Sequence, residues 1–147
     1  MKNFYSIQDV LNFAISREIE ANSFYEQLSQ DVDKPEIQNK LSYFALDEFQ
    51  HKTRLEAVRD GDKMLCQEEV GSLNIADYVD DIEPTPDMTY TDILALAMKR
   101  EKASFKLYSN LAAISKHEET RDVFLLLAQE EALHKLHLEI EYDLATF

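Results

Sequence analysis

The sequence predicts an all-α protein: a four-helix bundle made of two repeated helical hairpins that a long crossover joins. Three observations support this prediction. Apolar residues recur at spacings of three and four along four segments of about 25 residues, or about 37 Å each, which suits a bundle. The 147 residues include only 2 glycines and 3 prolines, which argues against a turn-rich β-sandwich or barrel. The connections are short, long and short, as in a bundle with one crossover.

Local signals place the two helices of the first hairpin. The first helix is expected from Ser6, which with Asp9 resembles a capping box, to about residue 30. The second is expected to begin in the segment 33–36, with an acidic cap and an early proline, and to stop at Gly61.

The second hairpin carries similar signals. The third helix is expected to open at Thr89, with Asp92 three residues on, and to end near Ser115. Ser115 with Glu118 is then expected to cap the fourth helix, which runs almost to Phe147.

The segment between the hairpins has a different composition, and we expect a short helix at residues 73–81 within it. Its length of about 28 residues exceeds the 2–8 that usually join adjacent antiparallel helices, and it is about right for a crossover along the bundle. Short, long, short is the ferritin-like arrangement. We therefore expect a single domain over residues 1–147, with hairpins at about 6–61 and 89–147 and a crossover at about 62–88.

The composition excludes several classes of partner and site. With 29 acidic and 15 basic residues the net charge is −14, so neither nucleic acid nor an anionic membrane is an expected partner. The N-terminus leads into an amphipathic pattern without a signal peptide, and no apolar run approaches the ~18–20 residues of a membrane span, so a cytoplasmic location is expected. The single cysteine, Cys66, excludes an internal disulfide and a cysteine-rich zinc or iron site.

The two hairpins repeat one another at a fixed offset of 83 residues, without a gap. Shared helical patterning would match leucines and alanines, but it would not match glutamate, histidine and tyrosine in register. The matched polar pairs are Glu18 and Glu101, Tyr25 and Tyr108, Glu48 and Glu131, and His51 and His134.

Each of these residues lies on the apolar stripe of its helix, where residues at spacings of three and four share one face. The predicted stripes, in chain order, are Leu11, Ala14, Glu18, Ala21, Tyr25 and Leu28; Leu41, Phe44, Ala45, Glu48, His51 and Leu55; Leu94, Ala97, Glu101, Ser104, Tyr108 and Leu111; and Phe124, Leu127, Ala128, Glu131, His134 and Leu138. Facing the four stripes inward brings four carboxylates and two imidazoles together at the middle of the bundle. Burying four carboxylates without compensation would cost many kcal/mol, whereas two divalent cations cancel their charge. Because the set has no thiolate, iron or manganese suits it, with zinc as an occupant in vitro. The predicted metal ligands are Glu18, Glu48, His51, Glu101, Glu131 and His134.

The pattern of these ligands is specific. One Glu from each of two helices with Glu-x-x-His from each of the other two is typical of ferritin-like di-metal carboxylate bundles. A single Glu-x-x-His arises by chance on any acidic helix, but here two occur at matching repeat positions. The alternative is a bundle whose site has lapsed into a polar network. His137 lies one turn beyond His134 and points largely away from the site, so a flanking role is expected for it.

The segments Ala14–Tyr25 and Ala45–His51, with their repeat partners ending at Tyr108 and His134, resemble the rubrerythrin branch of the ferritin-like family. The resemblance covers all four helices but not the crossover. It implies that the glutamates of the two Glu-x-x-His pairs bridge the metals and that each remaining Glu with one His completes one metal. It also implies that Tyr25 and Tyr108 hydrogen-bond the terminal glutamates, the alternative being ordinary core packing.

Two departures from rubrerythrins matter. Full-length rubrerythrins carry a C-terminal rubredoxin domain with four cysteines, whereas this chain ends at Phe147 with Cys66 alone. Its electrons would then come from another protein, such as a rubredoxin or ferredoxin. Rubrerythrins also tend to have an extra glutamate at the position of Ser104, and its absence leaves a symmetrical site of six ligands.

The expected function is that of a di-iron carboxylate protein that reacts with peroxide or dioxygen, as a rubrerythrin-like peroxidase or a ferroxidase-type oxidoreductase. A protein that binds or buffers iron without turnover is the main alternative, and a helical module with an empty site is a third. No organic cofactor is expected. Because such bundles often pair through exposed apolar faces, we expect a homodimer.

Overall fold

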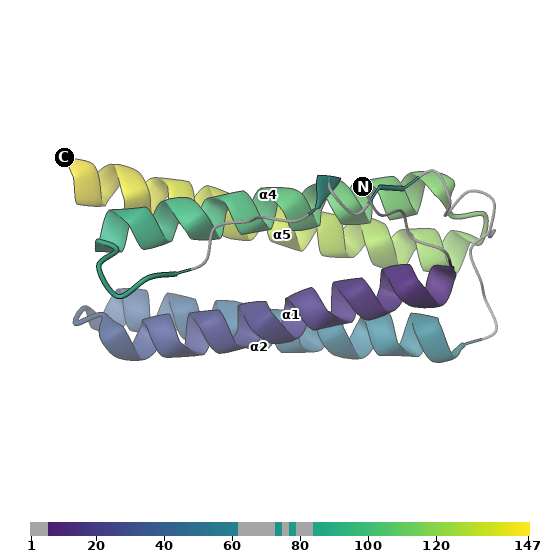
Figure 1. Cartoon of the computed structure of the whole chain (residues 1–147), viewed down its shortest axis with the longest axis horizontal. Helices are drawn as coiled ribbons and strands as arrows, with labels where there is room; N and C mark the ends of the chain where they lie inside the picture. The colour runs from purple at the N-terminus through teal and green to yellow at the C-terminus, as the bar shows by residue number, and fades with distance from the viewer. Residues whose placement is uncertain (1–5, 62–72, 75–76, 79–83) are drawn as a thin grey trace. The chain divides into compact units, whose positions relative to one another are not determined.

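The computed structural model describes residues 6–61, 73–74, 77–78 and 84–147. Within these residues it contains four long helices, α1 (Ile7–Asp31), α2 (Pro35–Asp60), α4 (Tyr90–Ile114) and α5 (Glu118–Thr146) (Figure 1). The chain divides into two compact units, one of residues 5–70 and one of residues 1–4 with 71–147. The first unit contains the hairpin α1–α2 and the second the hairpin α4–α5. All four expected helices are therefore present.

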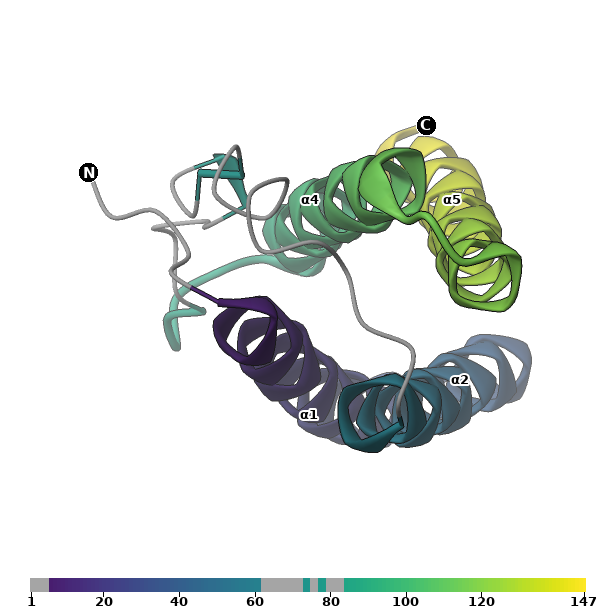
Figure 2. The ribbon, with the colours of Figure 1, turned by 90° about the vertical axis from the view of Figure 1, so that its right-hand side faces the viewer.

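In the first hairpin, α1 packs along α2, as both views of the ribbon show (Figures 1 and 2). The side chain of Ser6 accepts a hydrogen bond from the backbone N–H of Asp9 at 3.1 Å, as the sequence predicts. The predicted acidic cap of α2 is wrong, because the N-cap is Lys34, whose side chain makes no capping hydrogen bond. The physical reason is Pro35, which disfavours helical backbone in the residue before it and so places the boundary at Lys34.

In the second hairpin, α4 packs along α5 and begins with the complete capping box that the sequence predicts. Thr89 accepts from the N–H of Asp92 at 3.2 Å, and Asp92 accepts from the N–H of Thr89 at 3.1 Å. The predicted cap of α5 by Ser115 is wrong, since the N-cap is His117. Ser115 instead ends α4, where its N–H donates to the carbonyl of Ala112 and its hydroxyl donates to the carbonyl of His117.

The crossover is described at only a few positions, so the expected helix at 73–81 and Cys66 lie largely outside the described residues. Two of the described positions, Leu73 and Tyr78, are buried. The hydroxyl of Tyr78 accepts a hydrogen bond from the side chain of Asn110 in α4 at 2.8 Å. Burial raises the pKa of Tyr78, so its phenol stays neutral at physiological pH. This contact joins the crossover to α4.

The buried faces of the helices follow the predicted stripes closely. In α2 the buried residues are those predicted from the spacing, namely Leu41, Phe44, Ala45, Glu48, His51 and Leu55. In α5 the predicted stripe is buried throughout, with Thr120 in addition. In α1 and α4 the stripes are buried except at Ala21 and Ser104, which are half-buried. None of the described helices has both the length and the apolar composition that a membrane crossing needs.

The N-caps of α4 and α2 test how much a side-chain cap contributes to the stability of the protein. Replacing Thr89 with alanine removes the hydrogen bond that its hydroxyl accepts from the N–H of Asp92, and the free energy of unfolding in urea should fall by about 1 kcal/mol. Lys34→Ala is the matched control, because the side chain at that N-cap makes no capping bond. Equal losses of unfolding free energy in Thr89→Ala and Lys34→Ala would contradict a stabilising side-chain cap at Thr89.

Candidate metal centre

The first hairpin brings three potential metal ligands together. Glu18 comes from α1, while Glu48 and His51 lie one turn apart on α2, and all three side chains are about 1% exposed. The Nδ1 atom of His51 lies 3.5 Å from Oε2 of Glu18 and 3.3 Å from Oε1 of Glu48. One ligand atom from each residue lies within 4.8 Å of the others. We call Glu18, Glu48 and His51 the first half-site.

The second hairpin repeats this arrangement. Glu101 comes from α4, and Glu131 and His134 lie one turn apart on α5, with side chains that are at most 3% exposed. The Nδ1 atom of His134 lies 3.7 Å from Oε1 of Glu101 and 3.8 Å from Oε1 of Glu131. Their ligand atoms also lie within 4.8 Å of one another. We call Glu101, Glu131 and His134 the second half-site.

The geometry of both half-sites fits a bound cation. Hydrogen bonds between charged nitrogen and oxygen atoms are about 2.7–2.9 Å long, whereas the four separations given above run from 3.3 to 3.8 Å. Two atoms that each lie about 2.1 Å from one ion are about 3.0–3.4 Å apart at ordinary coordination angles. The observed spacing is therefore nearer to that of shared ligands than to that of direct hydrogen bonds.

The chemistry of the donors limits which cation fits. Each half-site supplies two carboxylates and one imidazole, and it contains no thiolate. Two buried negative charges would be strongly destabilising alone, and one divalent ion balances them. Oxygen and imidazole donors in this ratio suit iron or manganese, and zinc also binds such donors. Both half-sites thus have the composition of one metal position.

Both predicted tyrosines are buried, but what their hydroxyl groups do stays a prediction. Tyr25 and Tyr108 are each 1% exposed and lie two turns after the glutamate of their own helix. The ring of Tyr25 packs edge-on against Phe24 and Phe44, with ring centres 5.3 and 5.5 Å apart. These contacts support core packing for Tyr25, which does not conflict with a hydrogen bond from its hydroxyl group to a glutamate.

Other polar residues near the ligands in sequence lie outside the two half-sites. Within the part of the chain that the structure describes, His137 belongs to neither potential ligand group. The same is true of Asp47 and Glu130, which are half-buried. Glu20 is exposed and pairs with Arg17 at 3.1 Å. Nearness in sequence to a ligand therefore does not make a residue part of the site.

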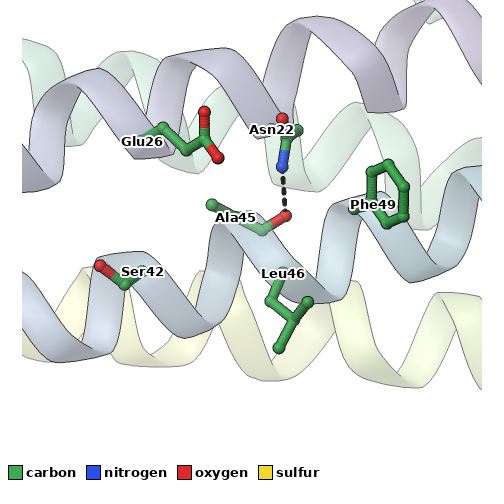
Figure 3. Close-up of a pocket in the computed structure, with 6 residues that line it drawn as sticks. All are labelled: Asn22, Glu26, Ser42, Ala45, Leu46 and Phe49. Atoms are coloured by element: carbon green, nitrogen blue, oxygen red, sulfur yellow. Dashed lines mark hydrogen bonds between the residues drawn. The ribbon is translucent and has the colours of Figure 1, made fainter.

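One residue near the first half-site escaped the sequence reasoning. The side-chain amide of Asn22 donates a hydrogen bond to the backbone carbonyl of Ala45 at 2.7 Å, which ties α1 to α2 (Figure 3). Asn22 lies one turn after Glu18, and Ala45 lies one turn before Glu48, so the bond sets the helix register beside the ligands. The repeat search could not reveal it, because the matching residue of the second hairpin is Phe105.

The same bond lies at a surface pocket of about 380 Å³ between α1 and α2. Two polar residues of α1 and four residues of α2 line it, and the side chains of Leu46 and Phe49 are half-exposed. Figure 3 shows the lining residues, Asn22, Glu26, Ser42, Ala45, Leu46 and Phe49. None of them is a predicted ligand, so this pocket is distinct from the half-site residues.

Comparison with known proteins identifies the fold. The sequence profile of the Rubrerythrin family matches residues 9–142. A Thermotoga maritima protein assigned to the ferritin-like diiron-carboxylate class is similar in structure, with a TM-score of 0.79 and 22% identity over 97% of this chain and 98% of that one. A hypothetical protein of Pyrococcus furiosus has a TM-score of 0.75 and 24% identity over 95% of this chain and 90% of that one. No curated protein matches significantly. The fold is a ferritin-like helical bundle, as predicted.

The two histidines of α5 provide a direct test of the second half-site. His134→Ala removes a buried nitrogen donor and should lower the affinity for Mn²⁺ at least about tenfold in an anaerobic titration. His137→Ala is the matched control and should leave that affinity unchanged. If both variants lose affinity equally, the assignment of His134 is wrong.

Proposed function

Because the chain belongs to the Rubrerythrin family, we propose that its two half-sites together bind a pair of iron ions that react with hydrogen peroxide or dioxygen. The observation that carries the proposal is the duplication of one buried donor set. Each hairpin holds two carboxylates and one imidazole at matching repeat positions, with side chains that are at most 3% exposed. A structural core has no use for such a set, because buried charges destabilise it.

The fold supports joining the half-sites into one centre. In a ferritin-like bundle the inner faces of the helices converge, so ligands at the same height on each hairpin are expected to meet. As the family resemblance implies, Glu48 and Glu131 would then bridge the two metals. Glu18 with His51 would complete one metal position, and Glu101 with His134 would complete the other. Four carboxylates balance the charge of two divalent ions.

The reaction follows from this ligand set. A pair of ferrous ions held there would supply the two electrons that, with two protons, convert one hydrogen peroxide to two waters. The four carboxylates hold the positive charge in place, and the two histidines act as neutral nitrogen donors. We expect the hydroxyl groups of Tyr25 and Tyr108 to orient the terminal glutamates. The apolar residues around the ligands limit the access of water.

The electrons that restore the ferrous state are expected from a separate carrier. These 147 residues contain one cysteine, so they cannot form the four-thiolate centre of a rubredoxin. A rubredoxin or a ferredoxin supplies one electron at a time, and two molecules replace the two electrons that one peroxide removes. We further propose that the protein acts in the cytoplasm and that it forms a homodimer.

An iron-binding or iron-buffering role without turnover is the second candidate. It is favoured by Ser104, which occupies the position where rubrerythrins tend to have an extra glutamate and leaves a symmetrical set of six ligands. The rate of re-reduction separates the two candidates, because a buffer does not need fast re-reduction by a carrier protein.

Oxidation by peroxide tests the proposed reaction. Protein loaded anaerobically with two Fe²⁺ and given one equivalent of hydrogen peroxide should have both ions oxidised to Fe³⁺. A ferrous chelator added after rapid quenching measures how much Fe²⁺ remains. Reduced rubredoxin should then restore both ferrous ions within seconds. Loaded protein that keeps its ferrous iron would refute the redox function, and oxidation without fast re-reduction would favour buffering.

A single substitution tests the bridge. Glu48→Ala should reduce the bound iron from two ions per chain to none, because a bridging carboxylate serves both metals at once. Asp47→Ala is the matched control, since it removes a neighbouring carboxylate that lies outside the half-sites, and it should still bind two ions. Plasma emission analysis of the loaded proteins gives the stoichiometry. Retention of one ion by Glu48→Ala would contradict a bridging role.

A further inference from the structure

Helix α5 has a second apolar face in addition to the one that carries its metal ligands. Six large aliphatic residues between positions 125 and 144 are exposed, with exposed fractions from 42% to 69%. At about 100° per residue they form a stripe roughly 100° wide, centred opposite the stripe that contains Glu131 and His134. We call these residues the outer stripe, namely Leu125, Leu126, Leu133, Leu136, Ile140 and Leu144.

The repeat shows that the hairpin fold does not require this stripe. At the matching positions of the first hairpin, five of the six residues are polar or small and one is Tyr43, although Leu46 and Phe49 on the same side of α2 are also half-exposed. These positions are Ser42, Tyr43, Gln50, Thr53, Ala57 and Gly61. The inner faces of α2 and α5 match in their predicted ligands and apolar residues, whereas the outer face of α2 exposes three large apolar residues, Tyr43, Leu46 and Phe49, and that of α5 exposes six. The outer stripe of α5 is therefore the larger of the two exposed apolar faces.

The exposed apolar area of the outer stripe is large enough for an interface between proteins. Taking roughly 180 Å² for a fully exposed leucine, the six exposed fractions amount to roughly 550 Å² of apolar surface, near the upper end of the ~300–600 Å² seen for the largest patch on a monomer. Two such surfaces together would bury about 1,100 Å², which exceeds the ~1,000 Å² expected of a specific interface. We propose that the outer stripe of α5 is the surface through which two copies of this chain associate.

The arrangement of the stripe suits a second copy. In a two-fold symmetric pair the same surface of each copy contacts itself, and an axis perpendicular to α5 makes the two α5 helices run antiparallel. With the axis between Leu133 and Leu136, each of these residues faces the other in the second copy. Leu126 and Leu144 lie seven residues before and eight residues after this central pair, so they also face one another. The stripe is thus complementary to itself.

The charges on α5 argue against a membrane surface as the occupant. A helix that lies on a membrane carries lysine and arginine on its polar face. Helix α5 carries eight acidic residues and only two basic ones, Arg121 and Lys135. The acidic Glu139, Glu141 and Asp143 lie beside the stripe at its C-terminal end, where an anionic lipid surface would repel them.

The overall charge gives the association a characteristic salt dependence. Two copies with a net charge of −14 each repel one another, and salt screens this repulsion. An apolar contact does not weaken in salt. Dimers formed by the outer stripe should therefore become tighter between 50 mM and 500 mM NaCl, whereas dimers held by ion pairs would become weaker.

The test compares two isoleucines of equal exposure on different helices. Ile140 in the stripe is 46% exposed, and Ile19 on α1 is 47% exposed. Sedimentation velocity of the full chain should show a dimer for the wild type and for Ile19→Glu, and a monomer for Ile140→Glu. The dissociation constant should rise at least about a hundredfold in Ile140→Glu, since the symmetric contact receives two buried carboxylates. Leu133→Glu with Leu46→Glu, both 50% exposed in the wild type, provides a second matched pair.

Each outcome decides the proposal. Circular dichroism and iron uptake show whether the variants fold, and monomeric, folded Ile140→Glu and Leu133→Glu beside dimeric Ile19→Glu and Leu46→Glu would support the α5 interface. A monomeric wild type, or dissociation of the Ile19→Glu or Leu46→Glu control, would overturn it. A wild-type monomer that co-sediments with phosphatidylcholine vesicles, while Ile140→Glu does not, would assign the stripe to lipid instead.

Discussion

The burial of paired carboxylates beside an imidazole is the constraint on which the rest of this structure depends. Each hairpin places two glutamates and one histidine on its apolar face, at positions where solvent cannot balance their charge. Burial destabilises such a set unless its charge is neutralised, so the proposed metal pair would couple folding to metal binding. The apolar residues around the ligands keep the site dry, and their period of three and four keeps the ligands on the same face of each helix.

The hairpin is the unit in which this constraint is met. In the first hairpin, the bond from Asn22 to the carbonyl of Ala45 sets the register of α1 against α2 one turn from both glutamates. The second hairpin has Phe105 at the position of Asn22, and its own contacts differ. The two hairpins also begin their helices differently, since Thr89 forms a full capping box while Lys34 forms no side-chain cap. The ligand triads agree although the details that position them do not.

The division of α5 into two apolar faces shows how one helix can serve two purposes. Its inner stripe holds the predicted ligands and is buried, while its outer stripe is aliphatic and about half exposed. The corresponding helix α2 exposes fewer large apolar residues on its outer face, namely Tyr43, Leu46 and Phe49. A metal centre needs an inner face of fixed composition, whereas association leaves the outer face free to differ between the repeats.

The sequence by itself determined the four helices and their inner stripes and predicted six metal ligands, because each depends on local spacing or on a repeat of 83 residues. It misplaced the caps of α2 and α5, where Pro35 and the end of α4 at Ser115 set the boundaries. Only the tertiary structure decided how Asn22 acts, since a bond between helices leaves no periodic signal in the chain. It also decided which apolar residues of α5 are exposed, because an aliphatic side chain has the same hydrophobicity whether a neighbour covers it or solvent does.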